Sequence, residues 1–264
     1  MRILAWTKVI RVGVAAVIMS LATAAAANAS TIYWADWTGT YTGGPFTGNA
    51  TITTPTTTVN VTYDNPAGIA FYQTGAGTDW WTDSTHAVRD NATSPFTSSQ
   101  VDNIPTYTDI VALQYAGSQT LTFSTSIANP VFSYVSLNGN GYAFLDQDFT
   151  ILSVGDGSAS NHCGWWGCGT SFKNVVNLGN GHIEYQLLGT GEPHGTIQFN
   201  GAFSTLTWRS LSNEFWNGFT VGVQGTAEEV FPDVVPEPST MVLLGSGFVA
   251  LIATMRRRQT GHHR

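Results

Sequence analysis

Both cysteines of the 264-residue chain lie in the stretch NHCGWWGCGTSF, residues 161–172, together with two tryptophans. Four residues separate Cys163 from Cys168, which argues against a thioredoxin-like redox motif, whose cysteines are two residues apart. In an oxidising compartment, two cysteines this close in sequence are expected to form a disulfide. Such a bond would contribute about 2 kcal/mol to stability and would mainly fix the conformation of one loop.

Two kinds of metal site have residues of the right type. Zinc would use the two thiolates with His162, but neither His182 nor His194 stands at a spacing that supplies a fourth ligand. Calcium prefers carboxylate oxygens, and no EF-hand or nonapeptide spacing is present. The candidate calcium ligands are Asp146, Asp148 and Asp156. We therefore predict no cofactor, with a structural calcium ion as the alternative.

Tryptophan contributes nine residues, and several stand in pairs or beside carboxylates and amides. Aromatic faces stack on the apolar faces of sugar rings, and a rigid loop loses little entropy on binding. The candidate glycan-binding residues are Trp80, Trp81, Trp165, Trp166 and Trp216. Because adjacent residues of a strand point to opposite faces, at least one of Trp165 and Trp166 should be exposed or packed in a loop. Tryptophans that alternate within strands are usually core residues, as we expect for Trp34, Trp37 and Trp208.

Catalysis has less support in the sequence. Polysaccharide cleavage needs two carboxylates about 5 to 10 Å apart, one of them with a raised pKa. The candidate pairs are Asp146 with Asp148, expected on one strand face, and Glu184 with Glu192. Alternation in HIEYQLL places Glu184 on the solvent side. The E-x-D-x-E, G-x-S-x-G, H-E-x-x-H and P-loop motifs are absent from the sequence, so we predict no catalytic residue and interpret His194 as a hydrogen-bonded turn residue.

The first 29 residues have the three parts of a secretory signal peptide. Basic residues precede an uncharged, largely apolar run from Val12 to Ala27, and Ala27-Asn28-Ala29 forms an A-x-A cleavage site. We expect cleavage after Ala29 and a mature chain that begins near Ser30. An uncleaved membrane anchor is the alternative.

A second apolar run, from Ser239 to Met255, is closed by Arg256, Arg257 and Arg258. At about 1.5 Å per residue the run spans roughly 26 Å, slightly less than the hydrocarbon core of about 30 Å. We therefore predict a transmembrane helix over 239–255 and a basic tail over 256–264. The arginines act as a stop-transfer signal that stays on the cytoplasmic side.

The end of the chain resembles the PEP-CTERM sorting signal of Gram-negative bacteria. The resemblance covers about the last 30 residues: Val235-Pro236-Glu237-Pro238, the Ser239-Thr240 pair, a glycine-containing apolar run and the arginine cluster. It implies export, transient anchoring in the inner membrane with the domain in the periplasm, and processing by an exosortase-type transpeptidase near Pro236, Glu237 and Pro238. It further implies delivery to the cell surface or to an exopolysaccharide matrix, as in a biofilm. A tail anchor that is never cut is the alternative.

The charge of the exported part excludes one class of partner. Between Ser30 and Val235 only Arg89, Lys173 and Arg209 are basic, against 16 acidic residues, which gives a net charge of −13. Such a surface repels nucleic acid and anionic lipid, so a nucleic-acid-binding function is excluded.

The middle of the chain consists of short alternating runs between clusters of Gly, Asn, Pro and Asp. The runs are residues 58–63, 109–115, 119–125, 131–137, 182–188, 195–201, 204–210 and 219–225. Period-two alternation predicts half-buried strands, and outside the termini no window shows a convincing 3.6-residue stripe. We predict one all-β domain over 30–225, an antiparallel two-sheet sandwich of jelly-roll type, with a barrel-like closure second. A linker over 226–238 joins it to the apolar run.

Three functions are compatible with these patterns. The first is a non-enzymatic protein of the cell envelope or extracellular matrix, which needs nothing beyond the features above. The second is a glycan-binding module that uses the tryptophans. The third is a polysaccharide hydrolase, which requires a buried carboxylate pair with a perturbed pKa. We rank them in that order.

Overall fold

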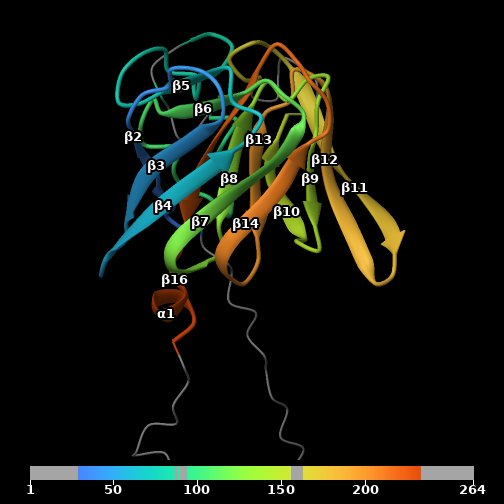
Figure 1. The fold of residues 1–264 in the computed structure, drawn as a ribbon. Helices are drawn as coiled ribbons and strands as arrows, with labels where there is room; N and C mark the ends of the chain where they lie inside the picture. The colour runs from blue at the N-terminus through green and yellow to red at the C-terminus, as the bar shows by residue number, and fades with distance from the viewer. Residues whose placement is uncertain (1–28, 87–88, 90–93, 156–162, 233–264) are drawn as a thin grey trace, which may run out of the picture.

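The structure, a computed structural model, describes residues 29–86, 89, 94–155 and 163–232 and folds them into two β-sheets (Figure 1). One sheet has seven strands in the order β10-β13-β8-β15-β6-β5, with β1 paired to β15. Its strands are β1 (Tyr33–Trp34), β5 (Phe71–Gln73), β6 (Ile110–Leu113), β8 (Val131–Val135), β10 (Phe149–Val154), β13 (Gly195–Phe199) and β15 (Asn217–Val223).

The other sheet has nine strands in the order β11-β12-β9-β14-β7-β4-β3-β2, with β16 paired to β7. Its strands are β2 (Asp36–Thr38), β3 (Phe46–Thr53), β4 (Thr58–Asn65), β7 (Gly117–Ala128), β9 (Tyr142–Leu145), β11 (Gly169–Gly179), β12 (His182–Gly191), β14 (Ala202–Ser210) and β16 (Gly225–Thr226). Every named strand pair is antiparallel, which confirms the predicted two-sheet antiparallel architecture.

From β6 to β11 successive strands alternate between the sheets, since β6, β8 and β10 lie in the seven-stranded sheet and β7, β9 and β11 in the nine-stranded one. All eight predicted runs form strands. In β4 the expected alternation is plain: Val59, Val61 and Tyr63 are buried, whereas Thr58 and Asn60 are exposed. The Pro/Thr-rich segment at residues 54–57 is the turn between β3 and β4.

The core between the sheets is largely aromatic. Trp208 of β14 stacks on Tyr63 at 5.8 Å between ring centroids and meets Phe132 at 5.1 Å and Phe219 at 5.2 Å, edge to face. The two phenylalanines belong to the opposite sheet, so one side chain joins both layers. Trp34, Trp37 and Trp208 are at most 4 % exposed, as predicted for core residues. Because the described strands share this core, residues 29–232 are expected to fold by themselves.

A short helix, α1 (Ala227–Val230), ends the described chain and is tied to the turn between β3 and β4. The Glu229 carboxylate accepts hydrogen bonds from Thr226 N at 2.6 Å, Thr54 Oγ1 at 2.8 Å and Thr56 N at 3.0 Å. Burial alone would raise the pKa of Glu229, but these bonds outweigh it and hold the pKa at about 2. The described chain therefore ends at a fixed point of the domain.

Figure 1 shows α1 at one end of the sandwich and β5 and β6, with their long connection, at the other. Within the described residues, no helix is both long and apolar enough to cross a bilayer. The predicted transmembrane helix over 239–255, the arginines and the Pro-Glu-Pro motif lie outside the described residues, as does the predicted signal peptide up to Asn28.

Candidate functional site

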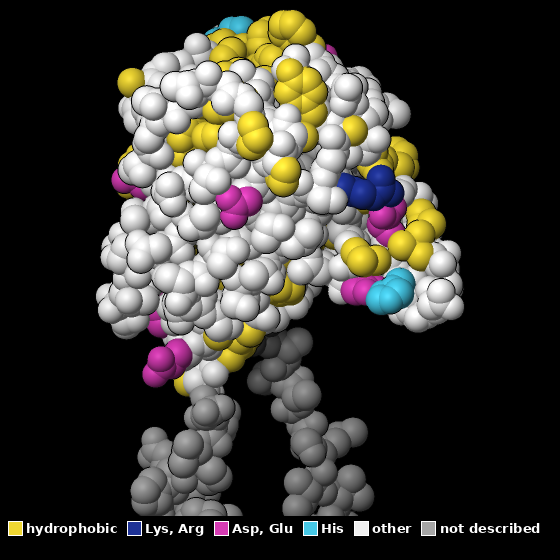
Figure 2. All heavy atoms as spheres, viewed as in Figure 1, with side chains coloured by type: hydrophobic (Ala, Val, Ile, Leu, Met, Phe, Trp, Pro, Cys, Tyr) yellow, Lys and Arg dark blue, Asp and Glu magenta, His cyan; other side chains and the backbone are white. Residues whose placement is uncertain are grey.

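Three connections at one end of the sandwich carry five large aromatic side chains. The β5–β6 connection supplies Trp80, the β10–β11 connection supplies Trp165 and Trp166, and the β14–β15 connection supplies Phe215 and Trp216. We call these five residues the aromatic end. Figure 2 shows hydrophobic side chains gathered at the top of the molecule, above the region of β5 and β6 in Figure 1.

The four tryptophan rings of the aromatic end pack on one another. Trp80 lies at the centre: its ring stacks on Trp166 at 5.5 Å and contacts Trp165 and Trp216 edge-on, each at 5.1 Å. Trp166 and Trp216 are 6.1 Å apart. Trp166 nevertheless remains 50 % exposed and Phe215 86 % exposed. The end therefore combines a rigid aromatic base with two rings open to solvent.

The cysteine loop is the element that holds Trp165 and Trp166 in place. Cys163 and Cys168 form a disulfide, which confirms the predicted clip and leaves no thiolate for the zinc alternative. Inside the loop, Gly167 N donates to Gly164 O at 3.0 Å. His86 from the β5–β6 connection stacks on Trp165 at 3.7 Å, and its Nε2 lies 3.0 Å from the Trp165 carbonyl oxygen. His162 lies outside the described residues.

His194 packs against the same loop and accepts a hydrogen bond from its backbone. It is 1 % exposed, and its Nδ1 accepts a hydrogen bond from Gly164 N at 3.2 Å. A Cβ atom at position 164 would lie 2.8 Å from His194 Cγ, so only glycine allows this close approach. The prediction of a hydrogen-bonded histidine is consistent with this position, and its buried ring positions the loop.

Trp81 does not belong to the aromatic end, although we predicted it as a candidate with Trp80. It is 1 % exposed, packs against Phe96 at 5.3 Å and donates from Nε1 to Asp109 O at 3.2 Å. The ring of Trp80 packs on the other tryptophans of the aromatic end, whereas the ring of Trp81 is buried in a cluster with Phe96 and Ile104. The glycan-binding assignment of Trp81 is therefore wrong.

A carboxyl group that the sequence pattern did not single out lies beside the aromatic end. Both carboxylate oxygens of Glu214, next to Phe215 and Trp216, are buried without a hydrogen-bond partner in the structure. Burial raises the pKa of Glu214 to about 7, and the negative charge of Glu192 adds to the rise. The amide of Asn217 offsets part of it, although its geometry falls short of a hydrogen bond. The only sequence signal is an acidic residue between polar and aromatic neighbours in NEFWN.

Glu192 is held differently, because hydrogen bonds from Ser136 Oγ at 2.8 Å and Asn138 Nδ2 at 2.5 Å satisfy its two carboxylate oxygens. Glu184, its partner in the predicted pair, is instead bonded to Arg209, so the two carboxylates lie in different hydrogen-bond networks.

Replacing Glu214 with glutamine is expected to make stability less dependent on pH. The folded protein keeps this carboxyl protonated up to about pH 7, whereas the unfolded chain ionises near the ordinary value of 4.5. The group's contribution is therefore fully present below about pH 4.5 and is lost as the pH rises through about 7. Allowing for its partial exposure, we expect the variant to be more stable than wild type by about 1 to 2 kcal/mol near pH 8 and similar near pH 4.

Urea unfolding at the two pH values measures this difference. Glu228→Gln is the matched control, because Glu228 is exposed on α1. A Glu214→Gln variant whose stability relative to wild type is the same at both pH values would contradict the assignment.

Glu184 is buried, contrary to the solvent-side position predicted from alternation. It is 6 % exposed because Arg209 of β14 lies over it, with Nε 3.1 Å and Nη2 2.9 Å from the carboxylate. Alternation along β12 predicts which face of the sheet Glu184 lies on, but it does not predict which side chains cover that face. The long side chain of Arg209, from a nearby strand, covers Glu184. A bidentate ion pair explains why this carboxylate is buried.

Asp146 and Asp148 lie in the turn between β9 and β10 rather than on one strand face, so that expectation is wrong. Asp146 has a positive φ of 55°, and its carboxylate accepts from Ile183 N at 2.8 Å and contacts His182 Nδ1 at 2.6 Å. Asp148 bonds to Lys173 Nζ at 2.8 Å. Asp156 lies outside the described residues, and the described part of the chain gathers no group of three metal-ligating side chains. Calcium binding stays an untested alternative to the prediction of no cofactor.

All three basic side chains between Ser30 and Val235 are engaged in ion pairs. Arg89 bonds to Asp79, Lys173 to Asp148 and Arg209 to Glu184. Since each positive charge has an acidic partner, none is left to attract a polyanion. The net charge of −13 is therefore not offset by a free basic patch.

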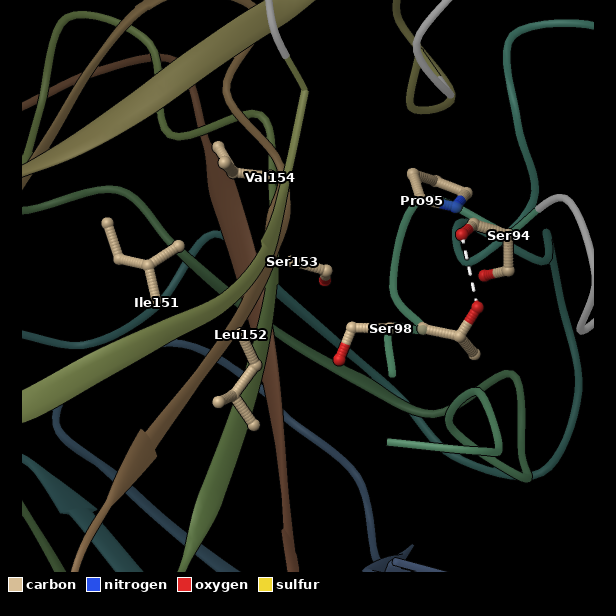
Figure 3. Close-up of a pocket in the computed structure, with 8 residues that line it drawn as sticks. Ser94, Pro95, Ser98, Ile151, Leu152, Ser153 and Val154 are labelled. Atoms are coloured by element: carbon tan, nitrogen blue, oxygen red, sulfur yellow. Dashed lines mark hydrogen bonds between the residues drawn. The ribbon is translucent and has the colours of Figure 1, made fainter. Parts of the chain in front are cut away.

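A separate hollow lies between residues 94–98 and β10, with a volume of about 280 Å³ (Figure 3). Ser94, Pro95 and Ser98 face Ser153 and its neighbours across it. The buried hydroxyl of Ser153 has no hydrogen-bond partner in the structure. None of the described residues that line this hollow is charged, and we assign it no chemistry.

Fold and site together define an all-β domain with an aromatic surface at one end and a C-terminal extension beyond α1. The extension is the part with known counterparts: residues 234–258 match the PEP-CTERM protein-sorting motif. This match confirms the resemblance and means that the chain carries the signal of an exported, exosortase-targeted protein. No curated protein and no solved structure matches the chain.

Proposed function

We propose that this exported protein acts without catalysis at the cell surface or in the extracellular matrix, where its aromatic end binds an uncharged polysaccharide. The observation that carries the proposal is the exposure of Trp166 on a base of packed tryptophans, with the exposed ring of Phe215 next to Trp216 in the chain. Rings fixed in this way stack on the apolar faces of sugars at little entropic cost.

Charge supports an uncharged ligand over an acidic one. The domain carries −13 between Ser30 and Val235, and each of its three basic side chains already pairs with a carboxylate. An acidic polysaccharide would be repelled, whereas stacking on a neutral sugar is not affected by net charge.

A binding role accounts for the acidic groups better than catalysis does. A glycoside hydrolase needs one carboxyl that protonates the leaving oxygen and a second that attacks or activates water. Glu214 has a raised pKa, but both its oxygens are buried away from solvent. Glu192 is bonded to Ser136 and Asn138 through both oxygens. Neither group is presented to a sugar, so we assign the protein no hydrolase activity.

Affinity electrophoresis of the purified domain tests the proposal. We expect retardation in gels that contain neutral polysaccharides and none in gels that contain alginate, an acidic polymer. Equal mobility in every gel, or retardation by the acidic polymer alone, would overturn the assignment.

The sorting signal leads to a prediction about the mature protein. We propose that the tail anchors the chain transiently in the inner membrane and that processing near Pro236, Glu237 and Pro238 releases the domain from it. Proline disfavours helical backbone at its own position and at the residue before it, so a Pro-Glu-Pro sequence suits the cleft of a processing enzyme that binds extended chain.

Mass spectrometry of protein released from the cells is expected to show an N-terminus near Ser30 and no peptide from Arg256 to Arg264. Deleting residues 236–238 is expected to leave the released fraction empty and the uncut chain in the membrane. Intact Arg256 to Arg264 in released protein would disprove processing at this signal.

A further inference from the structure

Strand β11 (Gly169–Gly179) is a long edge strand, and among the described residues no strand pairs with its outer side. It ends the nine-stranded sheet, pairs only with β12, and is shown at the margin of the molecule in Figure 1. The backbone groups of an edge strand that point away from its partner can pair with another strand. Natural edges are commonly protected by charge, proline or short length. β11 has eleven residues, no proline and one charged residue, Lys173.

The side chains of β11 are unusually apolar for an exposed edge. Phe172 is 47 % exposed, Val175 54 % and Leu178 53 %. Lys173 points toward the other sheet, where its Nζ bonds to Asp148 at 2.8 Å and lies 5.5 Å from the Phe149 ring. The one positive charge of the strand is therefore neutralised within the same molecule.

We propose that two copies of this chain associate through β11, with the two strands antiparallel across a twofold axis at Val175. In this register Val175 faces its own copy and Lys173 faces Asn177. Phe172 then lies opposite Leu178 at the flanks of the pair. Each exposed apolar side chain of the edge thus meets an apolar partner, and the two nine-stranded sheets become one continuous sheet.

The position of the axis follows from symmetry and charge. A twofold axis perpendicular to the sheet keeps every side chain on the same face of the sheet. Two residues that pair across the axis must therefore be an even number of positions apart in sequence, so the axis passes through a residue rather than between two residues. An axis at Lys173 would place two ammonium groups directly opposite each other, which is destabilising. The bulge between Asn177 and Gly179 interrupts the regular ladder, so an axis nearer the hairpin would lose pairs. An axis at Val175 allows Lys173 to Asn177 of both copies to pair.

The net charge sets how strongly the copies associate. Each exported domain carries −13, so the two repel one another at long range. Added salt screens this repulsion but leaves backbone hydrogen bonds and apolar contacts in place. We therefore expect a reversible dimer whose dissociation constant falls as ionic strength rises, the opposite of an interface held by ion pairs.

Sedimentation equilibrium of the purified domain tests the proposal. Wild type is expected to show a concentration-dependent dimer that strengthens with salt. Val175→Lys is expected to weaken dimerisation at least about tenfold, because two ammonium groups then face each other across the axis. The added lysine makes each domain less negative and so lowers the overall repulsion between domains. A loss of dimer in this variant therefore cannot result from net charge and must result from the change in β11.

Thr38→Lys is the matched control, since Thr38 is exposed on β2, the strand at the opposite edge of the same sheet. Val175→Cys provides a second test that does not weaken the interface: mild oxidation is expected to give a covalent dimer with the sedimentation of the wild-type dimer. A monomeric wild type at all concentrations, with no trapped dimer, overturns the proposal. Dimerisation of Val175→Lys equal to that of wild type and Thr38→Lys overturns it as well.

Discussion

Replacing Trp208 with alanine is expected to destabilise the domain by about 3 to 5 kcal/mol, a large part of the 5 to 15 kcal/mol that holds a typical domain folded. The ring is 1 % exposed and contacts Tyr63, Phe132 and Phe219, from both sheets. No neighbour can fill the space it leaves without moving one sheet against the other. The cavity cost therefore adds to the lost burial.

Urea unfolding monitored by far-UV circular dichroism measures this loss. Trp166→Ala is the control, because the same chemical change at a half-exposed ring creates no internal cavity. We expect it to cost about 1 kcal/mol or less. Equal losses in the two variants would mean that Trp208 does not join the sheets as described.

Replacing Trp166 and Phe215 together with alanine is expected to weaken binding to neutral polysaccharide by at least about tenfold, with little change in stability. Stacking of an aromatic ring contributes roughly 0.5 to 1.5 kcal/mol beyond its buried area, and two rings are removed. The packed base formed by Trp80, Trp165 and Trp216 stays in place, so the loss reports on the exposed rings.

Phe231→Ala is the control for this variant. Phe231 is 45 % exposed and directly follows α1, at the opposite end of the sandwich. Affinity electrophoresis should show wild-type retardation for the control and none, or nearly none, for the double variant. Equal retardation of both variants would place the binding surface elsewhere.

Most strands that bury large apolar side chains were predictable from the sequence, whereas exposed strands and strands with small buried residues were not. β4 alternates cleanly because one side faces the core, as Val59, Val61 and Tyr63 show. β11 lacks such alternation because most of its residues are exposed on both faces. In β3 the buried positions include Gly48 and Ala50, whose small side chains give a weak periodic signal. Hydrophobic periodicity reports burial of one face, so exposed edges and small-residue strands escape it.

The candidate site was predictable in part. Cysteine spacing predicted the disulfide, and local clustering brought Trp80, Trp165, Trp166 and Trp216 to attention. The burial of Glu184 depends on Arg209 from another strand, and the burial of Trp81 depends on a long connection packing over it. Neither is encoded in local periodicity, because both result from contacts distant in sequence. The raised pKa of Glu214 likewise depends on burial beside residues that only the fold brings near.

The two ends of the domain have separate roles in this account. The C-terminal end carries α1 and continues into the sorting signal at residues 234–258. The aromatic end lies at the opposite end of the sandwich (Figure 1). A tail that emerges far from the binding surface would leave that surface free while the chain is still anchored.

Hydroxyl-radical footprinting of the purified domain, with and without a neutral polysaccharide that retards it in gels, tests the central claim most directly. The account predicts that oxidation of Trp166 and Phe215 falls when the polysaccharide is present. Oxidation of Phe231, at the other end, should stay the same. Unchanged oxidation of Trp166 and Phe215, or protection confined to other residues, would contradict the account.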